Sequence, residues 1–542
     1  MAHPARPGFL MAAALRMATP STTYPTKMST QDLLQGLPER LHETITEWVS
    51  KQPDALAVED DLTALSYGQF DAATIAAAQK LTELGVRAGD RVIFVAENCV
   101  ALAVLFFAMS RLDAWACVVN ARLSAAEIEA IRAHSDARRV FYLHRLSPAA
   151  AAHADAAGAV QVDFEAIGAV RTGPRNTTCT PEPVEAAGAD QVAALIYTSG
   201  TTGKPKGVML THRNLIFVGD TYRRNRMQTP ADKAYAILPM SHVYGLSSVL
   251  IGMLVSGGAL LLECRFDPAR VADAWARRGI TVMHGVSAMY AKLLEWSRQT
   301  GTPLHAPHLR IAQGGGGPLS QSLKDDFEQT TGVVLHLGYG MTETSPTVAQ
   351  TRLDKPSRDV SSGQPIPGIE LRRVDSDGND VGPDAVGEVL VRGPNVMKGY
   401  YRDPEQTALA LSADGWLRTG DLGRQDAEGN LTIVGRAKEL IIRSGFNVYP
   451  VEVESAINAH PEVLQSAVVG REVTDNEEVV AFLETRENAT LTPETLETWL
   501  RERLSPYKIP SEIVILEHLP AAATGKILKT ELKRMAAARR HA

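Results

Sequence analysis

YTSGTTGKPKG, residues 197–207, decides how this part of the chain folds. An apolar run from Val192 to Ile196 precedes it, as expected of a buried strand, and a second apolar run, 208–210, follows it. A Walker A loop requires Ser or Thr directly after its lysine and then a helix, whereas here Pro205 follows Lys204. We therefore predict a strand–loop–strand hairpin at this point.

The composition of the same loop indicates what it could hold. Glycines allow backbone N–H groups to turn toward an anion, hydroxyl side chains add donors, and Lys204 and Lys206 add positive charge. A polyphosphate requires these groups. A glycine-rich hairpin loop without a ligand has a similar composition, so the composition alone leaves both interpretations open.

Strands and helices alternate along most of the chain from Leu41 onward. Short apolar strands, such as 91–95 and 140–143, are separated by helical segments, such as 67–84 and 125–135. This alternation predicts parallel sheets covered by helices on both faces.

The pattern changes toward the C-terminus. Turn sequences at 375–380 and 426–430 separate β-rich segments, and the chain beyond Arg436 mixes helices and strands. A chain of 542 residues exceeds what one core supports, so we predict at least two domains. The predicted class is α/β: a disordered extension (1–35), a large domain with two doubly wound sheets and a small β-rich subdomain (36–437), and a small mobile α+β domain (438–542).

The composition argues against several functional classes. A net charge of −7 without a long basic block makes nucleic acid an improbable partner. The four cysteines show no C-x-x-C spacing, which argues against a zinc site and favours a reducing compartment, the cytoplasm. The longest apolar run, Val100 to Met109, has half the length of a membrane span, so we expect no integral membrane association.

Two further segments carry groups that suit a nucleotide. In segment 338–344, Tyr339 offers a flat face for a purine, Thr342 a hydroxyl for a phosphate, and Glu343 an oxygen ligand for a hard cation. Asp421 follows a tryptophan-containing turn, and its two acceptor oxygens suit a pair of hydroxyl groups. Each segment alone is also compatible with an ordinary turn.

Together these segments resemble the motifs of the adenylate-forming superfamily, which includes acyl- and aryl-CoA synthetases, firefly-type luciferases and the adenylation domains of peptide synthetases. The match begins at 197–207, continues through 338–344 and Asp421, and ends at Thr524-Gly525-Lys526. The motifs follow the family's order over nearly all of the chain after residue 40. The resemblance implies an ATP-dependent carboxylate–CoA ligase that uses Mg²⁺, works through an acyl-adenylate, and takes a carboxylic acid, ATP and coenzyme A as substrates.

The resemblance also implies roles for individual residues. Lys526 would bridge the attacking carboxylate and the α-phosphate, His242 would gate the passage between the ATP site and the acyl pocket, and Lys438 would be the hinge of the small domain. The residues implied to bind ATP or AMP are Thr198, Ser199, Gly200, Thr201, Thr202, Gly203, Lys206, Gly316, Gly338, Tyr339, Gly340, Met341, Thr342, Asp421, Arg436 and Lys526. The implied metal ligands are Thr198 and Glu343, the implied CoA-binding residues are Ser444, Gly445 and Phe446, and the implied acyl pocket is Tyr244, Ser248, Val286, Met289 and Thr347.

The substrate is less closely defined. The mixed character of the pocket residues predicts an apolar monocarboxylate, either an aryl acid or a medium- to long-chain fatty acid. Lys292 could instead contact a second carboxylate, which would make the chain a malonate or oxalate ligase. A carrier protein could replace coenzyme A as acceptor, and an inactive nucleotide-binding protein is a further alternative. We expect a monomer or a homodimer.

Overall fold

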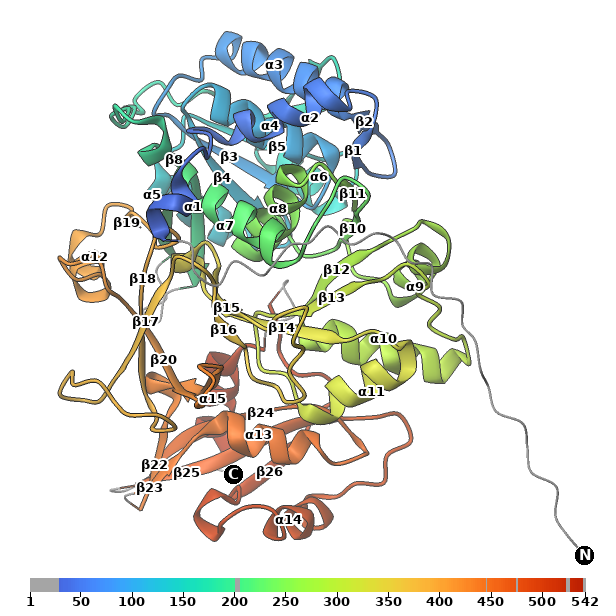
Figure 1. Cartoon of the computed structure of the whole chain (residues 1–542), viewed down its shortest axis with the longest axis vertical. Helices are drawn as coiled ribbons and strands as arrows, with labels where there is room; N and C mark the ends of the chain where they lie inside the picture. Colours follow the sequence, from blue (N-terminus) through green and yellow to red (C-terminus); the bar gives the residue numbers. More distant parts are fainter. Residues whose placement is uncertain (1–28, 200–204, 445, 474–475, 523–526, 540–542) are drawn as a thin grey trace, which may run out of the picture.

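The computed structural model describes residues 29–199, 205–444, 446–473, 476–522 and 527–539. Figure 1 shows the N-terminal helices and strands at one end, the C-terminal strands at the other, and the remaining sheets between them. The arrangement confirms the predicted α/β class, with a large multi-sheet N-terminal part and a smaller C-terminal part.

The first large sheet has eight strands and contains the predicted hairpin. Its centre is parallel, and the hairpin and the opposite edge are antiparallel. In spatial order the strands are β19 (Gly399–Tyr400), β9 (Pro205–Thr211), β8 (Val192–Ser199), β4 (Trp115–Asn120), β3 (Arg91–Ala96), β5 (Arg139–Tyr142), β7 (Gly168–Thr172) and β6 (Val160–Phe164).

The second large sheet has nine strands, of which the six from β14 to β1 pair in parallel. In spatial order they are β16 (Gln364–Pro365), β15 (Thr347–Gln350), β14 (Leu335–Gly340), β13 (Ile311–Gly314), β12 (Val282–Gly285), β10 (Lys233–Ala236), β11 (Ala259–Leu262), β1 (Leu56–Glu59) and β2 (Ala64–Ser66).

Helices cover both faces of the first sheet because its strands are apolar on both sides. Along β3, Val92 and Phe94 belong to one hydrophobic cluster and Ile93 and Val95 to another. The first cluster runs on into the second sheet, so the helices between the sheets share one core. The helices of this part are α2 (Thr46–Lys51), α3 (Tyr67–Glu83), α4 (Val100–Arg111), α5 (Ala125–Ser135), α6 (Pro148–Ala156), α7 (His212–Asn225), α8 (Gly252–Val255), α9 (Pro268–Arg277), α10 (Ser287–Thr300), α11 (Gln321–Thr331) and α12 (Pro404–Ala410), with short helical turns η1 (Leu41–Ile45), η2 (Gly188–Asp190) and η4 (Thr342–Thr344), and a π-helix, η3 (Tyr244–Ile251).

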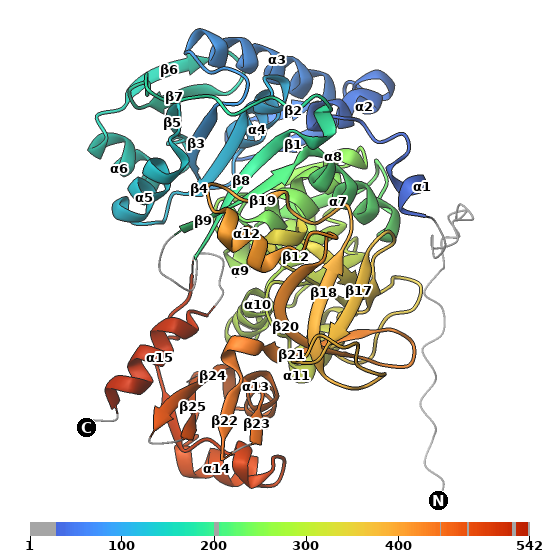
Figure 2. The same cartoon turned by 90° about the vertical axis from the view of Figure 1, so that its left-hand side faces the viewer.

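The predicted β-rich subdomain is a four-stranded antiparallel sheet of β17 (Glu370–Val374), β18 (Gly387–Arg392), β20 (Leu417–Gln425) and β21 (Leu431–Arg436). Asp375 and Asp426 form the predicted turns, because each carboxylate accepts two backbone N–H groups of its own turn. Figure 2 shows this sheet beside the larger sheets and above the C-terminal strands.

The C-terminal part packs three α-helices and a three-stranded sheet around its own clusters. It touches the large part through polar contacts: Arg486 pairs with Glu295 at 2.9 Å, and Gln299 donates to Glu487 at 2.9 Å. Its elements are η5 (Ala437–Glu439), β22 (Ile441–Arg443), β23 (Phe446–Val448), α13 (Pro450–Asn458), β24 (Val463–Val473), β25 (Asn476–Thr485), α14 (Pro493–Arg501), η6 (Pro506–Lys508), β26 (Glu512–Ile515) and α15 (Lys529–Ala538).

Residues 29–35 differ from the predicted disordered extension, because they include a short helix, α1 (Thr30–Leu34). Ser29 and Asp32 form a capping box, in which each side chain accepts the backbone N–H of the other residue. Leu33 is buried against Phe217 and Ile366, which anchors this segment to the large part. Residues 1–28 lie outside the described residues.

Candidate active site

The predicted hairpin is present, with Thr198 of β8 opposite Lys206 of β9. The antiparallel pairing holds the two ends of the loop one strand apart, so Thr198 and Lys206 flank its entrance. The loop residues predicted to bind phosphate, Gly200, Thr201, Thr202 and Gly203, lie outside the described residues, and so does Lys204. Ser199 is the last described residue of β8.

Strand β19, which the sequence analysis did not predict, pairs with this hairpin along β9. Tyr400 pairs with Val208 of β9, and the Nζ of Lys206 lies 5.2 Å from the centre of the Tyr400 ring. The same Nζ donates a hydrogen bond of 2.7 Å to Oε1 of Gln406 on α12. The signal available in the sequence was the pair of adjacent tyrosines, 400 and 401, directly after a glycine.

Glu343, the predicted Mg²⁺ ligand, contacts the other end of Tyr400. The Tyr400 hydroxyl donates a hydrogen bond of 2.8 Å to Oε1 of Glu343, and the backbone N–H of Met397 donates to the Glu343 carbonyl at 2.9 Å. Glu343 and Thr342 are both buried in the short helical turn η4. Tyr400 therefore joins the predicted metal ligand to the lysine of the phosphate loop.

The glycine-rich segment 338–344 lies partly within strand β14, which extends three residues beyond Leu337, the end of the preceding apolar run 333–337. The strand continues to Gly340 because it pairs with β15 on its far side, and a Cβ on Gly340 would lie 1.7 Å from the Pro346 carbonyl oxygen. Ser345 adopts a φ of +66° directly after η4. This close turn places Thr342 and Glu343 at the carboxyl edge of the parallel strands, where α/β sheets commonly bind ligands.

Tyr339, Asp421 and Arg436 meet where β14 approaches the β-rich sheet. The Tyr339 hydroxyl donates to Oδ2 of Asp421 at 2.7 Å, and Nε of Arg436 lies 2.9 Å from Oδ1. Asp421 and Arg436 are cross-strand partners on β20 and β21. The negative charge of Asp421 raises the pKa of Arg436, and burial raises the pKa of Tyr339 well above its ordinary value. The structure therefore brings together three residues predicted separately to bind the nucleoside.

The chemistry of these groups fits a magnesium nucleotide. An aromatic face and a buried carboxylate suit an adenosine, and the Glu343 carboxylate supplies the hard oxygen ligand that Mg²⁺ prefers. Among the described residues, no three or more His, Cys, Asp or Glu side chains cluster as a metal cage. A single carboxylate still fits, because Mg²⁺ usually keeps water ligands and binds substrate phosphates.

The predicted acyl-pocket residues are all buried, at 9% exposure or less, and four of them lie on η3 and at the start of α10. A Cβ on Gly315 would lie 3.0 Å from the Tyr244 ring, and one on Gly316 would lie 3.6 Å from Val286. Ser248 lies one turn after Tyr244, and the Met289 N–H donates to the Val286 carbonyl. Gly315 and Gly316 therefore lie against two of the predicted pocket residues, Tyr244 and Val286.

Thr347 and His242 border this group. Thr347 pairs with Gly340 across β14 and β15, which joins the predicted pocket to the nucleotide segment. His242 lies two residues before the start of η3, and its Nδ1 accepts the backbone N–H of Tyr244 at 3.3 Å. Both positions are compatible with the predicted roles, which stay predictions.

A row of buried polar side chains, which the sequence analysis missed, crosses three parallel strands next to Tyr244. His284, Gln313 and His336 are in register on β12, β13 and β14. Across from them, the Tyr222 hydroxyl of α7 bonds His284 Nε2 at 2.8 Å and Gln313 Oε1 at 3.3 Å. Burial lowers the pKa of both histidines to about 3. Polar residues inside otherwise apolar strands were the available signal.

Several atoms in and near this row have no hydrogen-bond partner among the described residues. They are His284 Nδ1, the hydroxyls of Tyr244 and Ser248, and Nε and Nη2 of Arg226. Arg226 is fully buried, donates Nη1 to the Thr351 carbonyl at 2.7 Å, and forms no ion pair with a described carboxylate. The surroundings of the predicted acyl pocket are therefore more polar than the pocket residues themselves suggest.

The predicted hinge and CoA-binding residues lie at the start of the C-terminal part. Lys438 is exposed within η5. The Ser444 N–H donates to Oδ1 of Asn476 at 2.6 Å, and the half-exposed Phe446 ring stacks on Tyr507 at 4.7 Å. Among the described residues, these partners belong to the C-terminal part, so the structure does not bring Ser444 or Phe446 to the nucleotide residues. Gly445 lies outside the described residues.

Lys526, the predicted catalytic lysine, also lies outside the described residues, as does the rest of 523–526. On either side of this segment, Ala521 pairs with Ile527, and the Leu528 N–H donates to the Pro520 carbonyl at 2.8 Å. The two described chain ends are therefore held together. The role of Lys526 stays a prediction.

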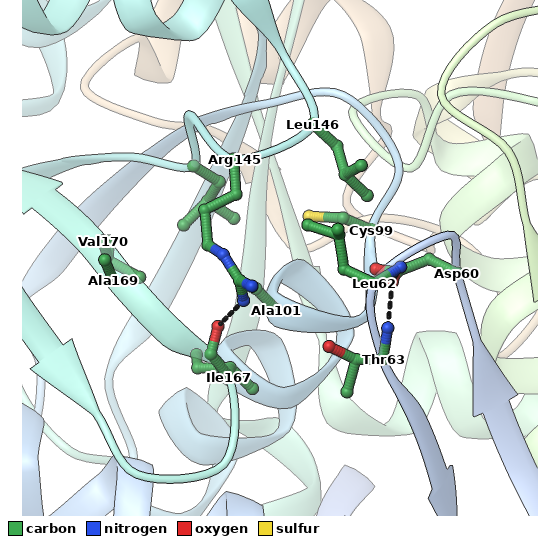
Figure 3. A pocket seen from close by; sticks show the side chains of 11 residues that line it. Asp60, Leu62, Thr63, Cys99, Ala101, Arg145, Leu146, Ile167, Ala169 and Val170 are labelled. Atoms are coloured by element: carbon green, nitrogen blue, oxygen red, sulfur yellow. Dashed lines mark hydrogen bonds between the residues drawn. The ribbon is translucent and has the colours of Figure 1, made fainter.

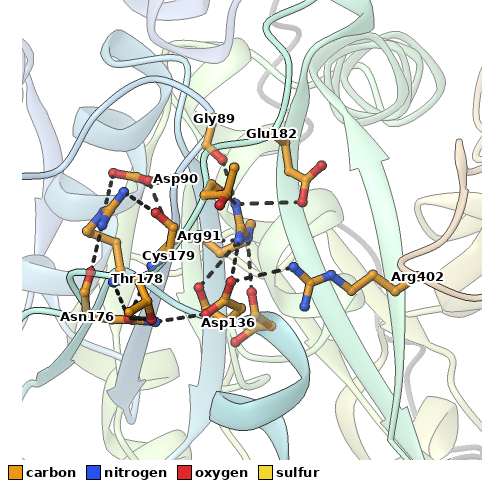
Figure 4. Close-up of polar contacts among 12 residues, drawn as sticks. Gly89, Asp90, Arg91, Asp136, Asn176, Thr178, Cys179, Glu182 and Arg402 are labelled. Atoms are coloured by element: carbon orange, nitrogen blue, oxygen red, sulfur yellow. Dashed lines mark hydrogen bonds and ion pairs between the residues drawn. The ribbon is translucent and has the colours of Figure 1, made fainter.

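Two other polar features of the large part lie apart from the predicted site. Figure 3 shows a pocket lined by Asp60, Cys99 and Arg145, in which burial raises the pKa of Cys99 to about 12. No predicted site residue lines this pocket. Figure 4 shows the second feature, a network in which the buried Arg91 lies near Asp136 and Glu182.

Comparisons with known proteins identify the family of the chain. The profile of the AMP-binding enzyme family matches residues 45–401, and that of the AMP-binding enzyme C-terminal domain matches residues 452–526. A feruloyl-CoA synthase from Amycolatopsis sp is 34% identical, over 89% of this chain and 96% of its own length. A 4-coumarate–CoA ligase from Oryza sativa subsp. japonica is 31% identical, over 97% and 98%.

A solved structure is also similar. The O-succinylbenzoate coenzyme A synthetase from Bacillus subtilis, in complex with ATP and magnesium ion, aligns with a TM-score of 0.76 and 29% identity, over 90% of this chain and 99% of that chain. The AMP-binding enzyme profile covers the hairpin and Tyr339, and the relatives align over almost their whole length. The chain therefore belongs to the AMP-binding enzyme family, within the adenylate-forming superfamily.

Proposed function

We propose that this AMP-forming acid–thiol ligase joins an aryl or a medium- to long-chain acyl monocarboxylic acid to coenzyme A. The reaction passes through an acyl-adenylate and releases pyrophosphate and AMP. The observation that carries the proposal is that Asp421 bonds both Tyr339 and Arg436. Tyr339 lies four residues before Glu343, whose carboxylate Tyr400 joins to Lys206. This arrangement supports a nucleoside at one end and its phosphates at the other.

In the first half-reaction, an oxygen of the substrate carboxylate attacks the α-phosphorus of ATP, and the bond to pyrophosphate breaks. Both partners are negatively charged, so the site must position them and neutralise charge. Lys526 and the Thr342 hydroxyl would contact the α-phosphate, and Lys206 would contact the outer phosphates. Glu343 would hold Mg²⁺, which neutralises phosphate charge when bound.

In the second half-reaction, the sulfur of coenzyme A attacks the acyl carbon, and the carbon–oxygen bond to AMP breaks. We propose that the small domain turns about Lys438 between the two steps. Lys526 would then leave the site, and the segment 444–446 would approach it. The present position of Ser444 and Phe446, away from the nucleotide residues, supports a movement before thioester formation.

The buried Tyr244, Val286 and Met289 side chains support an aryl or acyl chain as the substrate. One observation favours a second candidate, a dicarboxylic acid. The Arg226 guanidinium is fully buried without an ion-pair partner among the described carboxylates, and a second carboxylate on the substrate would supply one. Lys292 on α10, which the sequence also offered for this task, is exposed, so Arg226 is the better placed of the two.

Pyrophosphate release tests the proposal. Aliphatic, aromatic and dicarboxylic acids are supplied with Mg·ATP, with and without coenzyme A, to the native chain and to Lys526→Ala. We expect CoA-dependent turnover with one class of monocarboxylic acid and its loss in the variant. Release that coenzyme A does not change would point to another acceptor, such as a carrier protein, and ATP binding without release for any acid would favour an inactive binding protein.

We further propose that the enzyme works in the cytoplasm, as a monomer or a homodimer, without a nucleic acid partner. All four cysteines are free, which supports a reducing compartment. Among the described residues, no helix is both long and apolar enough to cross a bilayer.

A further inference from the structure

We propose that Tyr400 is a positioning residue of the nucleotide site, which fixes the Glu343 carboxylate with its hydroxyl and seats the Lys206 ammonium on its ring. The inference rests on the proposed function, because it concerns how this chain prepares for a magnesium nucleotide. It assigns a task to a strand, β19, that carries none of the motif residues predicted from the sequence.

The contacts of Tyr400 carry the proposal. Its hydroxyl donates a hydrogen bond of 2.8 Å to Oε1 of Glu343, and the Lys206 Nζ lies 5.2 Å from its ring centre. A hydroxyl on one carboxylate oxygen restricts the rotation of the group and leaves Oε2 for a cation. A cation over an aromatic face is attracted by the electrons of the ring. One side chain therefore sets the distance between a cation ligand and a phosphate-binding cation.

The Tyr400 hydroxyl is suited to donate rather than accept. A carboxylate only accepts hydrogen bonds, so the Tyr400 hydroxyl supplies the proton of its bond to Glu343. The Lys206 ammonium is fixed from a second side by Gln406, at 2.7 Å. Fixing a lysine before the nucleotide arrives lowers the conformational entropy lost on binding.

The next residue, Tyr401, explains why Tyr400 is rigidly held. Tyr401 directly follows β19 and is buried in the second hydrophobic cluster, whereas Tyr400 packs against the first, so the two side chains point to opposite faces of the sheet. Its hydroxyl donates to Oε1 of Glu182 at 2.6 Å, and its N–H donates to the Gly207 carbonyl at 2.7 Å. The Arg402 guanidinium lies 5.0 Å from the Tyr401 ring, and Figure 4 shows Glu182 beside the buried Arg91 and Arg402 beside Asp136.

The two tyrosines provide a matched pair of variants. Tyr400→Phe keeps the ring over Lys206 and removes only the bond to Glu343, whereas Tyr401→Phe removes the bond to Glu182 on the other face. A hydrogen bond to a charged group is typically strong enough that its loss weakens binding about 10-fold or more. We expect Tyr400→Phe to weaken Mg·ATP binding by about 10-fold, and Tyr401→Phe to lower the melting temperature and leave that affinity within about 2-fold.

The measurement is calorimetric binding of ATP without any acid substrate, once with Mg²⁺ and once with EDTA. We expect Tyr400→Phe to lose most of the gain in affinity that Mg²⁺ gives the native enzyme, and to bind metal-free ATP nearly as the native enzyme does. Tyr400→Leu, which also removes the ring, should weaken metal-free ATP binding as well, because Lys206 loses its seat.

A double substitution then tests whether the hydroxyl acts through Glu343. In a Glu343→Gln background, Tyr400→Phe should cause no further loss of the Mg²⁺ effect. The proposal is overturned if a folded Tyr400→Phe variant keeps the full Mg²⁺ effect, or if Tyr401→Phe loses it equally. If the native enzyme itself binds no ATP, the proposed function fails instead, which is a separate outcome.

Discussion

The nucleotide side and the acyl side of the candidate site differ in whether their buried polar groups have hydrogen-bond partners. On the nucleotide side, Asp421 bonds both Tyr339 and Arg436, and Tyr400 bonds Glu343. On the acyl side, the hydroxyls of Tyr244 and Ser248 are buried without a hydrogen-bond partner among the described residues. The first half is assembled before a ligand arrives, and the second holds groups whose partners the described chain does not supply.

The difference teaches where the specificity for the acid should lie. Paired groups keep their geometry whatever acid is present, so they should serve every substrate equally. A buried donor without a partner costs free energy that a suitable substrate atom can recover, so such groups discriminate between acids. Substitutions on the nucleotide side should therefore change all rates by a common factor, and substitutions on the acyl side should change the ranking of acids.

The largest effect is expected for Lys526→Ala. Removing a group that stabilises charge in the transition state typically slows a reaction by about 10²–10³-fold. We expect that loss in acid-dependent pyrophosphate release, by the same factor for every acid that the native enzyme accepts. Lys533→Ala, an exposed lysine of α15, is the control and should release pyrophosphate at the native rate. A loss confined to one acid would contradict the assignment of Lys526 to the nucleotide side.

Asp421→Asn should have the next largest effect. The amide keeps the shape of the side chain but lacks the negative charge. That charge pairs with Arg436 and strengthens the hydrogen bond that Tyr339 donates. Loss of a charged hydrogen bond is worth about 1.5–3 kcal/mol, so KM for ATP should rise by roughly 10- to 100-fold with a smaller change in kcat. Asp377→Asn, in an exposed turn of the β-rich sheet, is the matched control. An unchanged KM for ATP would remove Asp421 from the nucleotide half.

The third prediction concerns the pH dependence of stability, which depends on the buried His284 next to the acyl side. Burial holds the pKa of His284 at about 3, below its ordinary 6.5, so the unfolded chain binds a proton that the folded chain does not. The free energy of unfolding therefore falls as the pH drops below 6.5, by about 2 kcal/mol per such histidine between pH 7.5 and pH 5. We expect His284→Gln to lose about 2 kcal/mol less than the native chain over this interval. Urea unfolding at both pH values measures it, and equal losses would show that His284 titrates normally.

The smallest effect compares Tyr222→Phe with Tyr244→Phe. Both side chains are buried, but among the described residues only the Tyr222 hydroxyl of the two has partners, His284 and Gln313. Tyr222→Phe should lower the free energy of unfolding by about 1 kcal/mol, whereas Tyr244→Phe should leave it unchanged or raise it. Denaturant unfolding of the ligand-free enzyme gives both values. An equal loss in the two variants would mean that Tyr244 is as well satisfied as Tyr222.

The sequence predicted an element well where the residues that determine its ends lie within or next to the element itself. The helix predicted at 125–135 has those bounds, because Ser124 and Glu127 form a capping box at its start. Helix α1 was missed because its stability depends on burying Leu33 against distant residues. Strand β14 extends beyond its apolar run because β15 pairs with it, which the run itself does not encode.

The site was predictable residue by residue but not as a set of contacts. Motifs named Tyr339, Asp421 and Arg436, yet their mutual bonding depends on two sheets meeting. Tyr400 was missed because its partners lie about 60 and 190 residues away in the chain, which no local pattern reports. The polar row on β12 to β14 was missed because it exists only through the register of three strands.

The contacts between the C-terminal part and helices α10 and α11 have a consequence for how the enzyme responds to its medium. Arg486 with Glu295, Gln299 with Glu487, and the Ser322 hydroxyl with the Asn458 carbonyl are all polar pairs that water and dissolved ions can replace. Each pair contributes little free energy, and the ion pair of Arg486 with Glu295 weakens as ionic strength rises. The domain movement proposed above should therefore respond to salt concentration, and a ligand that prefers one orientation by a few kcal/mol can reset the balance.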